Sequence, residues 1–265
     1  MFHEKTIWIT GASSGIGEAV AYEMAKEGAC LILSARREDA LKRVQETCLS
    51  FGCAKDQLLV LPLDVTDEAA MPAAVAKAKA FKGHIDMLFN NAGISQRSLC
   101  VETDMATYRR LFDVDVFGQI ALTKQVLPLM LDRGQGHIAV TASVAGKVGV
   151  RQRTGYCAAK HAMMGFFDAL RAEVAKDGVF VTTITPGYIR TAIAENAITG
   201  DGKTFGKMDD NIKGGMDVTE CAQDIMKGFK ARKREIPVGN GKEMKALWVK
   251  RFFPNSLFKM VEKMG

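Results

Sequence analysis

Short apolar runs alternate with helix-like segments along most of the chain, and this alternation constrains the fold more than any other feature. The runs LILS at 31–34, LLVL at 58–61 and VFVTTI at 179–184 are apolar at consecutive positions, as in strands covered on both faces. The alternation predicts one α/β domain over residues 1–265, a doubly wound parallel sheet of about seven strands with helices on both faces. The expected strands are 6–10, 29–34, 58–62, 85–89, 136–141, 179–184 and 235–238, and the expected helices are 16–27, 38–51, 68–82, 106–132 and 155–177.

Composition and charge are those of a folded soluble protein. Apolar residues make up 48% and charged residues 25%, and 36 Lys and Arg against 30 Asp and Glu give a net charge of +6. This mild basic excess suits an anionic ligand or an acidic membrane surface, and no nucleic-acid partner is expected.

The cysteines, and the lack of signals for secretion or membrane insertion, predict where in the cell the protein is located. Six cysteines are scattered without a CxxC or His-rich pairing, so neither a metal site nor a disulfide framework is predicted, and free thiols are typical of a reducing compartment. The first expected strand begins at residue 6, which leaves no room for a signal peptide. No apolar stretch approaches the ~20 residues of a membrane span. We therefore expect a cytoplasmic protein.

A glycine-rich segment, TGASSGIG at 10–17, begins with the last residue of the first expected strand. Gly11, Gly15 and Gly17 have the spacing G-x-x-x-G-x-G, whereas the usual dinucleotide fingerprint is G-x-G-x-x-G. A tight turn here would point the free N–H groups and the positive dipole end of the next helix at a phosphate. The glycines alone leave two interpretations open, a phosphate-binding turn or a plain strand-to-helix connection.

Two arginines after the second expected strand favour the phosphate-binding turn. Arg36 and Arg37 stand where a doubly wound dinucleotide fold places the group that meets the adenosine ribose. An acid at this point would accept from a free 2′-hydroxyl, whereas two guanidinium groups would bind a 2′-phosphate. The pair predicts NADP(H) in preference to NAD(H), with a solvated basic pair at the start of a helix as the alternative.

A tyrosine and a lysine four residues apart form the candidate catalytic pair. Tyr156 and Lys160 project from one face of the expected helix 155–177, and Ser143 follows the preceding strand. An ammonium group favours a neighbouring phenolate, so a tyrosine in this setting can exchange a proton with an alcohol oxygen, to which Ser143 can also hydrogen-bond. Taken alone, a Tyr-x-x-x-Lys pair is a weak signal that surface helices often contain by accident.

Taken together, the motifs resemble those of the short-chain dehydrogenase/reductase family in its compact form. They are T-G-x-x-x-G-x-G at 10–17, N-N-A-G at 90–93, Ser143, Tyr156-x-x-x-Lys160 and P-G-x-x-x-T at 186–191. The match spans residues 5–192, and TGYCAAKHAMMGFFDALRAEV at 154–174 particularly resembles the branch that contains hydroxysteroid dehydrogenases. The resemblance implies a Rossmann-type domain with a nicotinamide cofactor.

The resemblance also implies a role for each matching position. Tyr156 is implied as the acid/base, Lys160 as the residue that favours its phenolate and holds the nicotinamide ribose, and Ser143 as the residue that orients the carbonyl. Asp64 is implied to accept from the adenine amine. The implied cofactor-binding residues are Gly11, Ser13, Ser14, Gly15, Ile16, Gly17, Arg36, Arg37, Asp64, Val65, Asn91, Ala92, Gly93, Tyr156, Lys160, Pro186, Gly187, Ile189 and Thr191.

One position departs from the family pattern. The family commonly has an asparagine as a fourth catalytic residue in an N-x-x-G stretch, and here that stretch is Asp115-Val116-Phe117-Gly118. In the family the backbone carbonyl at this site holds a water that links the lysine to solvent, and this contact does not need the side-chain amide. We therefore expect Asp115 to keep the relay, with a charge that raises the pKa of Lys160 and shifts the pH optimum.

Two further segments point to the substrate end of the site. Residues 192–217 hold five glycines and many polar side chains. Long loops of this kind are usually either disordered or functional lids, and the position of this one near the end of a sheet favours a substrate lid. Residues 240–265 form a C-terminal extension, in which large apolar side chains stand among six basic ones. A basic amphipathic segment can pack over the substrate cleft, against a sister subunit or on a membrane surface, and the first is favoured here.

These observations predict an NADP(H)-dependent oxidoreductase that interconverts a carbonyl and a secondary alcohol by hydride transfer. Apolar side chains at the expected substrate end, such as Ile94, Val144 and Val148, favour a lipophilic substrate, and relatives pair through helices that here predict a homodimer or homotetramer. A non-catalytic NADP(H)-binding sensor or scaffold is the alternative, but such relatives typically lose the Tyr or the Lys. A nucleotide-sugar epimerase or dehydratase is disfavoured because too few residues follow Thr191 for its substrate domain.

Overall fold

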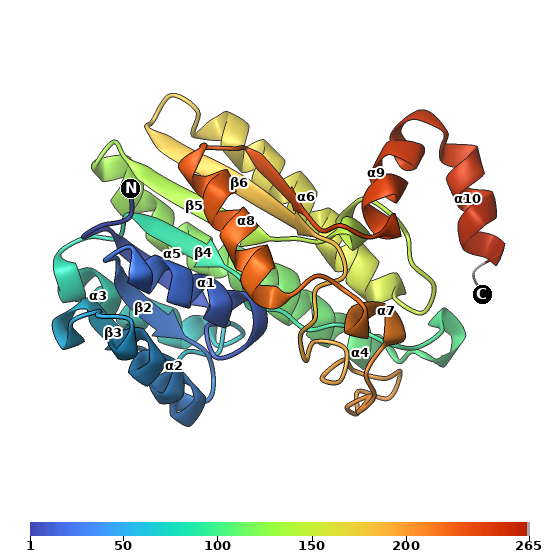
Figure 1. Cartoon of the computed structure of the whole chain (residues 1–265), viewed down its shortest axis with the longest axis horizontal. Coiled ribbons are helices and arrows are strands. Elements are labelled where there is room, and N and C mark those ends of the chain that lie inside the picture. Colours follow the sequence, from blue (N-terminus) through green and yellow to red (C-terminus); the bar gives the residue numbers. More distant parts are fainter. Residues whose placement is uncertain (264–265) are drawn as a thin grey trace.

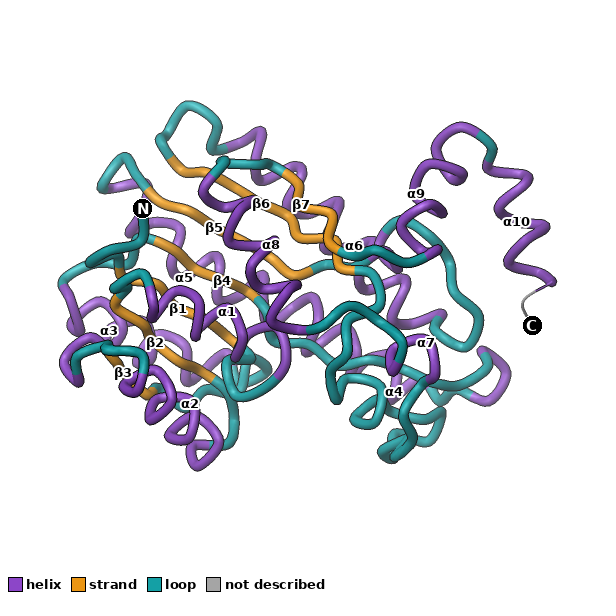
Figure 2. Tube along the Cα trace, viewed as in Figure 1, coloured by secondary structure: helices purple, strands orange, loops and turns teal. Residues whose placement is uncertain are grey.

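Across residues 1–263, which the computed structural model describes, seven parallel strands form one sheet in the order β3-β2-β1-β4-β5-β6-β7 (Figure 2). The strands are β1 (Thr6–Thr10), β2 (Cys30–Ser34), β3 (Leu58–Val60), β4 (Met87–Asn90), β5 (Gly136–Thr141), β6 (Val179–Pro186) and β7 (Glu235–Val238). The helices are α1 (Gly15–Lys26), α2 (Glu38–Ser50), α3 (Met71–Lys82), α4 (Met105–Phe112), α5 (Gly118–Asp132), α6 (Thr154–Glu173), α7 (Asp210–Lys213), α8 (Val218–Lys230), α9 (Lys242–Phe252) and α10 (Pro254–Lys263). The predicted doubly wound sheet with helices on both faces is confirmed (Figure 1).

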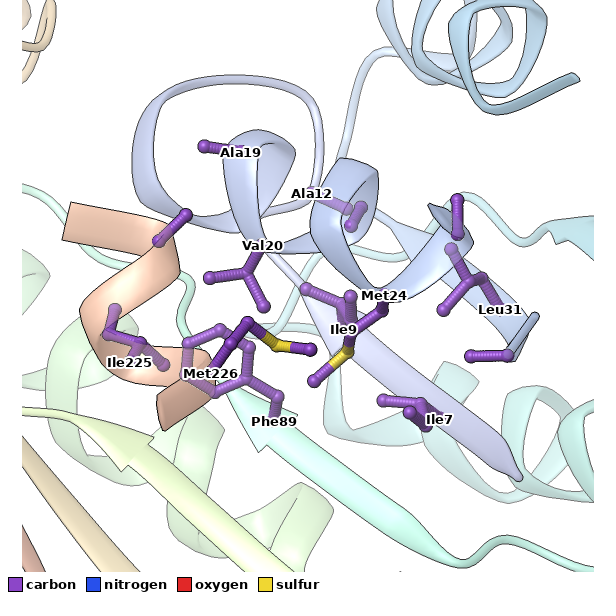
Figure 3. Packing of buried hydrophobic residues seen from close by; sticks show 14 of the residues in the cluster. Ile7, Ile9, Ala12, Ala19, Val20, Met24, Leu31, Phe89, Ile225 and Met226 are labelled. Atoms are coloured by element: carbon purple, nitrogen blue, oxygen red, sulfur yellow. The ribbon is translucent and has the colours of Figure 1, made fainter. Parts of the chain in front are cut away.

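The continuous apolar runs are explained by two cores, one on each face of the sheet. Alternate side chains of a strand point to opposite faces, so Ile7 and Ile9 of β1 join one core while Trp8 joins the other. Figure 3 shows the first core, in which Val20 and Met24 of α1 pack on the sheet beside residues of α8. Helices α3, α5 and α6 cover the second core. All five residues of β1 are buried, because helices cover the sheet on both sides.

The strand order places a crevice between β1 and β4. Strand β1 pairs with β2 on one side and with β4 on the other, so the connections that leave β1 and β4 go to opposite halves of the sheet. In open parallel sheets this reversal leaves a crevice at the carboxyl ends of the strands, where ligands bind. The glycine-rich segment and the N-N-A-G motif both follow strands that meet at this point.

Two features of the helices were not predicted. Helix α8 was not predicted, although its buried residues have the spacing of one helix face. The Asp217 side chain caps its N-terminus by accepting from the Thr219 N–H at 2.8 Å. The predicted helix 106–132 is divided between α4 and α5 by a π-helical turn, Asp113–Phe117. Single π-helical turns occur frequently at functional sites, and this one carries Asp115.

The expectation that no segment is long and apolar enough for a membrane span was wrong for the helical stretch from Met105 to Asp132. It has 28 residues and a mean hydropathy of 1.2 over its most apolar window, of which 44% is buried. Leu122, Val126 and Met130 of α5 are fully buried in the second core. Core helices of globular proteins also meet these criteria, so length and composition carry little weight here.

Candidate active site

A cavity of about 1010 Å³ lies at the carboxyl ends of the strands. Its wall includes residues that directly follow five strands, which are Gly11, Ala35, Asn91, Ala142 and Gly187. Every residue of the predicted site lines this cavity except Gly17 and Asp115. The structure therefore brings together motifs that are up to 180 residues apart in the sequence.

The glycine-rich turn has a backbone that only glycine adopts without strain. Gly11 and Gly15 have φ angles of +63° and +60°, in the left-handed region. A Cβ atom on Gly11 would lie 2.9 Å from the Ala92 backbone, so the turn and the N-N-A-G segment approach closely. Helix α1 begins at Gly15, and the start of this helix faces the cavity. The turn leaves backbone N–H groups for an anionic ligand, as a pyrophosphate requires.

Asn91 joins the ends of three neighbouring strands. Its Nδ2 atom lies 3.3 Å from the carbonyl oxygens of Thr10 and Gly11, and its Oδ1 atom accepts from the Thr141 hydroxyl at 3.0 Å. Gly17 packs against this junction instead of lining the cavity, since a Cβ on it would lie 2.4 Å from the Gly11 carbonyl oxygen. Gly17 thus positions the start of α1 against the turn.

Gly17→Ala is expected to destabilise the protein by about 1–3 kcal/mol, because the added methyl group meets backbone that cannot move freely. The matched control is Gly165→Ala, also within a helix. A Cβ on Gly165 meets nothing within 4 Å, so the better helix propensity of alanine should stabilise the protein by up to ~1 kcal/mol. Urea unfolding of both variants measures the difference, and equal effects would contradict the packing role of Gly17.

Two exposed arginines and a partly buried carboxylate form the end of the cavity beside β2 and β3. Arg36 and Arg37 line the cavity and form no ion pair with any residue in the part of the chain that the structure describes. Asp64 also lines it, and its Oδ1 atom accepts from the backbone N–H and the hydroxyl of Thr66 at 2.9 and 2.8 Å. The two guanidinium groups are therefore accessible to an anionic ligand.

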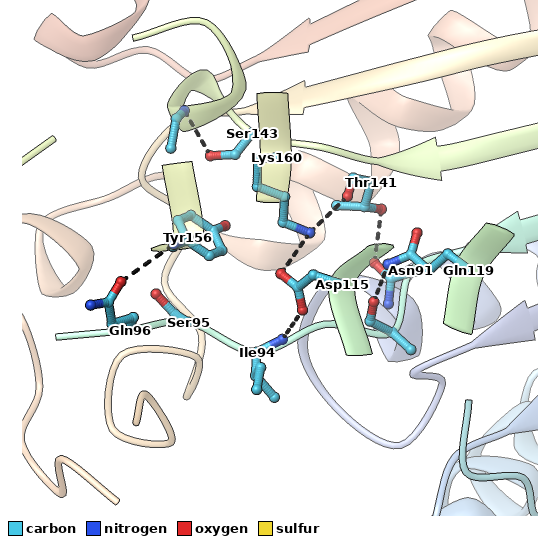
Figure 4. Close-up of polar contacts among 12 residues, drawn as sticks. Asn91, Ile94, Ser95, Gln96, Asp115, Gln119, Thr141, Ser143, Tyr156 and Lys160 are labelled. Atoms are coloured by element: carbon cyan, nitrogen blue, oxygen red, sulfur yellow. Dashed lines mark hydrogen bonds and ion pairs between the residues drawn. The ribbon is translucent and has the colours of Figure 1, made fainter. Parts of the chain in front are cut away.

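Helix α6 carries Tyr156 and Lys160 on one face, one turn apart. The two side chains are almost fully buried, and the Lys160 Nζ atom lies 5.6 Å from the centre of the Tyr156 ring. Figure 4 shows both near Ser143, whose Oγ atom accepts from the Ala145 N–H at 3.1 Å. The Lys160 ammonium also donates to the Thr141 carbonyl oxygen at 3.2 Å. All three predicted catalytic side chains of this group reach the cavity wall.

Asp115 is completely buried behind Lys160. Its Oδ1 atom accepts from the Ile94 N–H at 2.7 Å, and its Oδ2 atom lies 3.3 Å from the Lys160 Nζ atom (Figure 4). Burial alone would lower the pKa of Lys160, but Asp115 and Tyr156 together outweigh this effect and the pKa is raised above its ordinary value. Burial raises the pKa of Asp115 as well, although Lys160 and the Ile94 N–H oppose the rise.

Gln96 holds the start of α6 and was not predicted from the sequence. Its side-chain oxygen accepts from the backbone N–H groups of Gly155 and Tyr156, at 2.8 and 3.4 Å. The amide is fully buried, and its nitrogen donates to the hydroxyls of Ser98 and Thr103. Gln96 therefore caps the helix that carries the catalytic pair. Its position, 60 residues from Tyr156, gives no local pattern in the sequence.

A buried ion cluster joins the predicted lid to the wall of the cavity. The Oδ2 atom of Asp209 lies 2.8 Å from Arg97 and 3.1 Å from Arg153, and Arg153 also donates to the Ser95 hydroxyl at 2.8 Å. Burial would raise the pKa of Asp209, but the Asn211 N–H and the two guanidinium groups outweigh it and lower the pKa. The sequence did not predict this cluster, because no sequence pattern relates Arg153 to Asp209, which are 56 positions apart.

The predicted lid, 192–217, and the C-terminal extension both line the cavity at its predicted substrate end. From 192–217, Ile193, Ile198 and Ile212 line the cavity, and Ile198 forms isolated β-bridges with Gln96 and Thr204. From the C-terminal helices, the lining residues are Lys242, Glu243, Ala246, Leu257, Met260 and Val261. Side chains of the extension therefore line the cavity, and its role as a cover over the substrate stays a prediction.

Comparisons with known proteins agree with this geometry. A family model described as short chain dehydrogenase matches residues 5–202. Human "Dehydrogenase/reductase SDR family member 7" is 39% identical over 99% of this chain and 78% of its own length. "Dehydrogenase/reductase SDR family protein 7-like" from Anopheles gambiae is 39% identical over 98% of this chain and 82% of its own length.

Solved structures are similar over most of the chain. Levodione reductase superimposes with a TM-score of 0.81 at 26% identity, over 92% of this chain and 99% of that one. A short-chain dehydrogenase/reductase from Burkholderia phymatum in complex with NAD gives 0.80 at 26% identity, over 89% of each chain. A short-chain dehydrogenase from Streptomyces avermitilis superimposes with a TM-score of 0.83 at 28% identity, over 98% of this chain and 97% of that one.

Proposed function

Because this chain belongs to the short-chain dehydrogenase family of oxidoreductases, we propose that it interconverts a carbonyl and a secondary alcohol with NADP(H) as its preferred cofactor. The observation that carries the proposal is the convergence of Tyr156, Lys160 and Ser143 on the wall of one cavity. That cavity extends from the glycine-rich turn to the lid, so it has room for a dinucleotide and a substrate end to end.

The residues that would hold the cofactor fit a dinucleotide phosphate. The glycine-rich turn would present backbone N–H groups to the pyrophosphate, Arg36 and Arg37 would bind the 2′-phosphate, and Lys160 would hold the nicotinamide ribose. Pro186, Gly187, Ile189 and Thr191 lie at the nicotinamide end. When bound, the nicotinamide supplies the hydride for reduction and accepts it in the reverse direction.

Three side chains carry out the proton chemistry. In the reductive direction the Tyr156 hydroxyl gives its proton to the oxygen of the developing alcohol, and in the oxidative direction the phenolate removes it. The Lys160 ammonium stabilises that phenolate, and its own charge is stabilised by Asp115. The Ser143 oxygen accepts from the Ala145 N–H, and its hydroxyl donates to the Pro186 carbonyl oxygen over a long 3.5 Å. A substrate oxygen at the cavity wall would take this weak hydrogen bond in place of Pro186.

Arg36→Ala is expected to weaken NADPH binding by about 2–3 kcal/mol, the size of a lost charge-assisted contact, and to change NADH binding little. Fluorescence titration of both cofactors measures the two affinities. Arg109→Ala is the matched control, because Arg109 is exposed on α4 and does not line the cavity. Equal losses for NADPH and NADH in the Arg36 variant would overturn the proposed cofactor preference.

We further propose a lipophilic substrate. Apolar side chains form part of the predicted substrate end, where Val144, Val148, Ile198, Ile212 and Leu257 line the cavity together with the Arg97–Arg153–Asp209 cluster. Transfer of an apolar substrate into such a surface is favoured by about 25 cal/mol for each Å² removed from water. A panel of steroid, retinoid, quinone and acyl-ketone carbonyls tested with NADPH should show turnover for these in preference to short polar ketones.

A further inference from the structure

Helices α9 and α10 form a helical hairpin that stands out from the rest of the molecule (Figure 1). We call this segment, 242–263, the C-terminal hairpin. Its inner face packs on the loop after β5, where Leu257 is buried against Val144 and Val148. The Glu243 carboxylate turns inward as well and accepts from the Tyr188 N–H at 3.2 Å. The inner face is therefore an ordinary packed surface.

The C-terminal hairpin exposes four large aromatic side chains. Trp248 is 70% exposed, Phe252 59%, Phe253 66% and Phe258 47%. The rings of Trp248 and Phe252 stack with their centres 5.7 Å apart. Isolated exposed apolar residues are normal on soluble proteins, but four exposed aromatic residues on one short segment, two of them stacked, indicate a surface that contacts something apolar.

The C-terminal hairpin also carries an excess of basic side chains. The C-terminal hairpin contains six basic and two acidic residues, and one of the acidic residues is the inward-facing Glu243. Lys250 lies over the Phe258 ring, with its Nζ atom 4.3 Å from the ring centre. Exposed aromatic residues among Lys and Arg are typical of helices that lie at the surface of an anionic bilayer.

We propose that the C-terminal hairpin docks this protein on the surface of anionic lipid bilayers. A second copy of the chain is disfavoured as the occupant, because a symmetric contact would bring two like-charged hairpins together. A bilayer that contains anionic lipid supplies both the apolar layer for Trp248 and Phe252 and the negative charge for the basic side chains. The proposal needs no catalytic activity and stands apart from the proposed function.

Because the hairpin lies beside the cavity, docking on a bilayer would also affect how a substrate reaches the cavity. Met260 is 53% exposed, yet it also lines the cavity together with Leu257 and Val261. The hairpin thus contributes residues both to the exposed surface and to the cavity wall. A lipophilic molecule dissolved in the bilayer would reach the substrate end of the cavity at the edge of this segment.

The chain contains its own reporter for this interaction. It has two tryptophans, and Trp8 is fully buried with its indole N–H donating to the Ser34 hydroxyl at 2.8 Å. Only Trp248 is accessible, so changes in tryptophan emission report on the hairpin. We would mix the full-length protein with vesicles of phosphatidylcholine containing 30% phosphatidylserine, or without it, and with brominated lipids as quenchers. The expected result is a blue shift and quenching on anionic vesicles, reduced at high salt.

Sedimentation of variants with the same vesicles tests the aromatic and the basic residues of the hairpin separately. Phe252→Ser with Phe253→Ser, and separately Lys250→Gln with Arg251→Gln and Lys259→Gln, should each lower the fraction bound by at least about tenfold. The matched controls lie away from the hairpin. They are Leu49→Ser on α2, at the far end of the molecule in Figure 1, and the exposed set Lys55→Gln, Lys77→Gln and Lys79→Gln.

Two results would overturn the proposal. One is unchanged Trp248 emission, with the unmodified protein left in the supernatant, on anionic vesicles at low salt. The other is a blue shift without lipid that grows with protein concentration alongside a doubled mass in light scattering, which would make this face a subunit interface. Because quenching by brominated lipid uses the unmodified protein, neither result depends on whether a variant folds.

Discussion

Substitution of Tyr156 by phenylalanine is expected to lower kcat for NADPH-dependent carbonyl reduction by about 100- to 10,000-fold, the contribution of a positioned general acid. The change removes one hydroxyl and keeps the ring, which packs with Ala145 and Cys157. Cofactor affinity should therefore stay nearly the same. The cause is chemical, since the developing alcohol oxygen loses its proton donor while Lys160 and Ser143 remain in place.

Single-turnover absorbance of NADPH measures this hydride-transfer step, and fluorescence titration measures cofactor binding separately. Tyr108→Phe is the matched control, because it removes a hydroxyl that lies 2.8 Å from Thr154 Oγ1, outside the cavity. The control should retain turnover within a few-fold of the unmodified protein. Unchanged turnover in Tyr156→Phe would exclude Tyr156 as the acid/base.

Asp115→Ala is expected to destabilise the protein by about 3–5 kcal/mol, the usual cost of removing one partner of a buried ion pair. The variant leaves the Lys160 ammonium with the Thr141 carbonyl oxygen but without its counter-charge, and it leaves the Ile94 N–H without an acceptor. Urea unfolding measures the loss. A loss below ~1 kcal/mol would show that the pair contributes little to the folded state.

Asp115→Asn separates the charge from the hydrogen bond. An amide oxygen can still accept from Ile94, so the fold should be retained and the turnover number should stay within about tenfold at the optimum. The carboxylate raises the pKa of Lys160, and its removal lowers that pKa. The lysine then loses its proton at lower pH, so the alkaline limb of the kcat profile should move to lower pH. A change of more than about tenfold at every pH would contradict this account.

The sheet and most of the cavity wall could be predicted because their signals are local. The five buried residues of β1 precede the glycine turn directly, and Tyr156 and Lys160 share a face because a helix repeats every 3.6 residues. Helix α8 could have been predicted too, since Ala222, Ile225, Met226 and Phe229 follow helical spacing after the Asp217 cap.

The remaining features depend on residues that only the folded chain brings together. Asp115 reaches Lys160 through a π-helical turn, and no periodicity in the sequence signals that turn. The Gln96 cap and the Arg153–Asp209 pair join loops whose path is set by packing. For Gly17 the sequence motif identified a residue of the turn, and its position against the Gly11 carbonyl adds a packing role that the motif does not signal.

The Asn91 side chain has a consequence for the energetics of ligand entry. By joining Thr10, Gly11 and Thr141, it holds the ends of β1, β4 and β5 in place when the protein folds. The crevice is thus preorganised, and the loss of conformational entropy that accompanies ordering of a binding site occurs during folding. A dinucleotide that enters this crevice keeps the free energy of its contacts instead of losing part of it to ordering the chain.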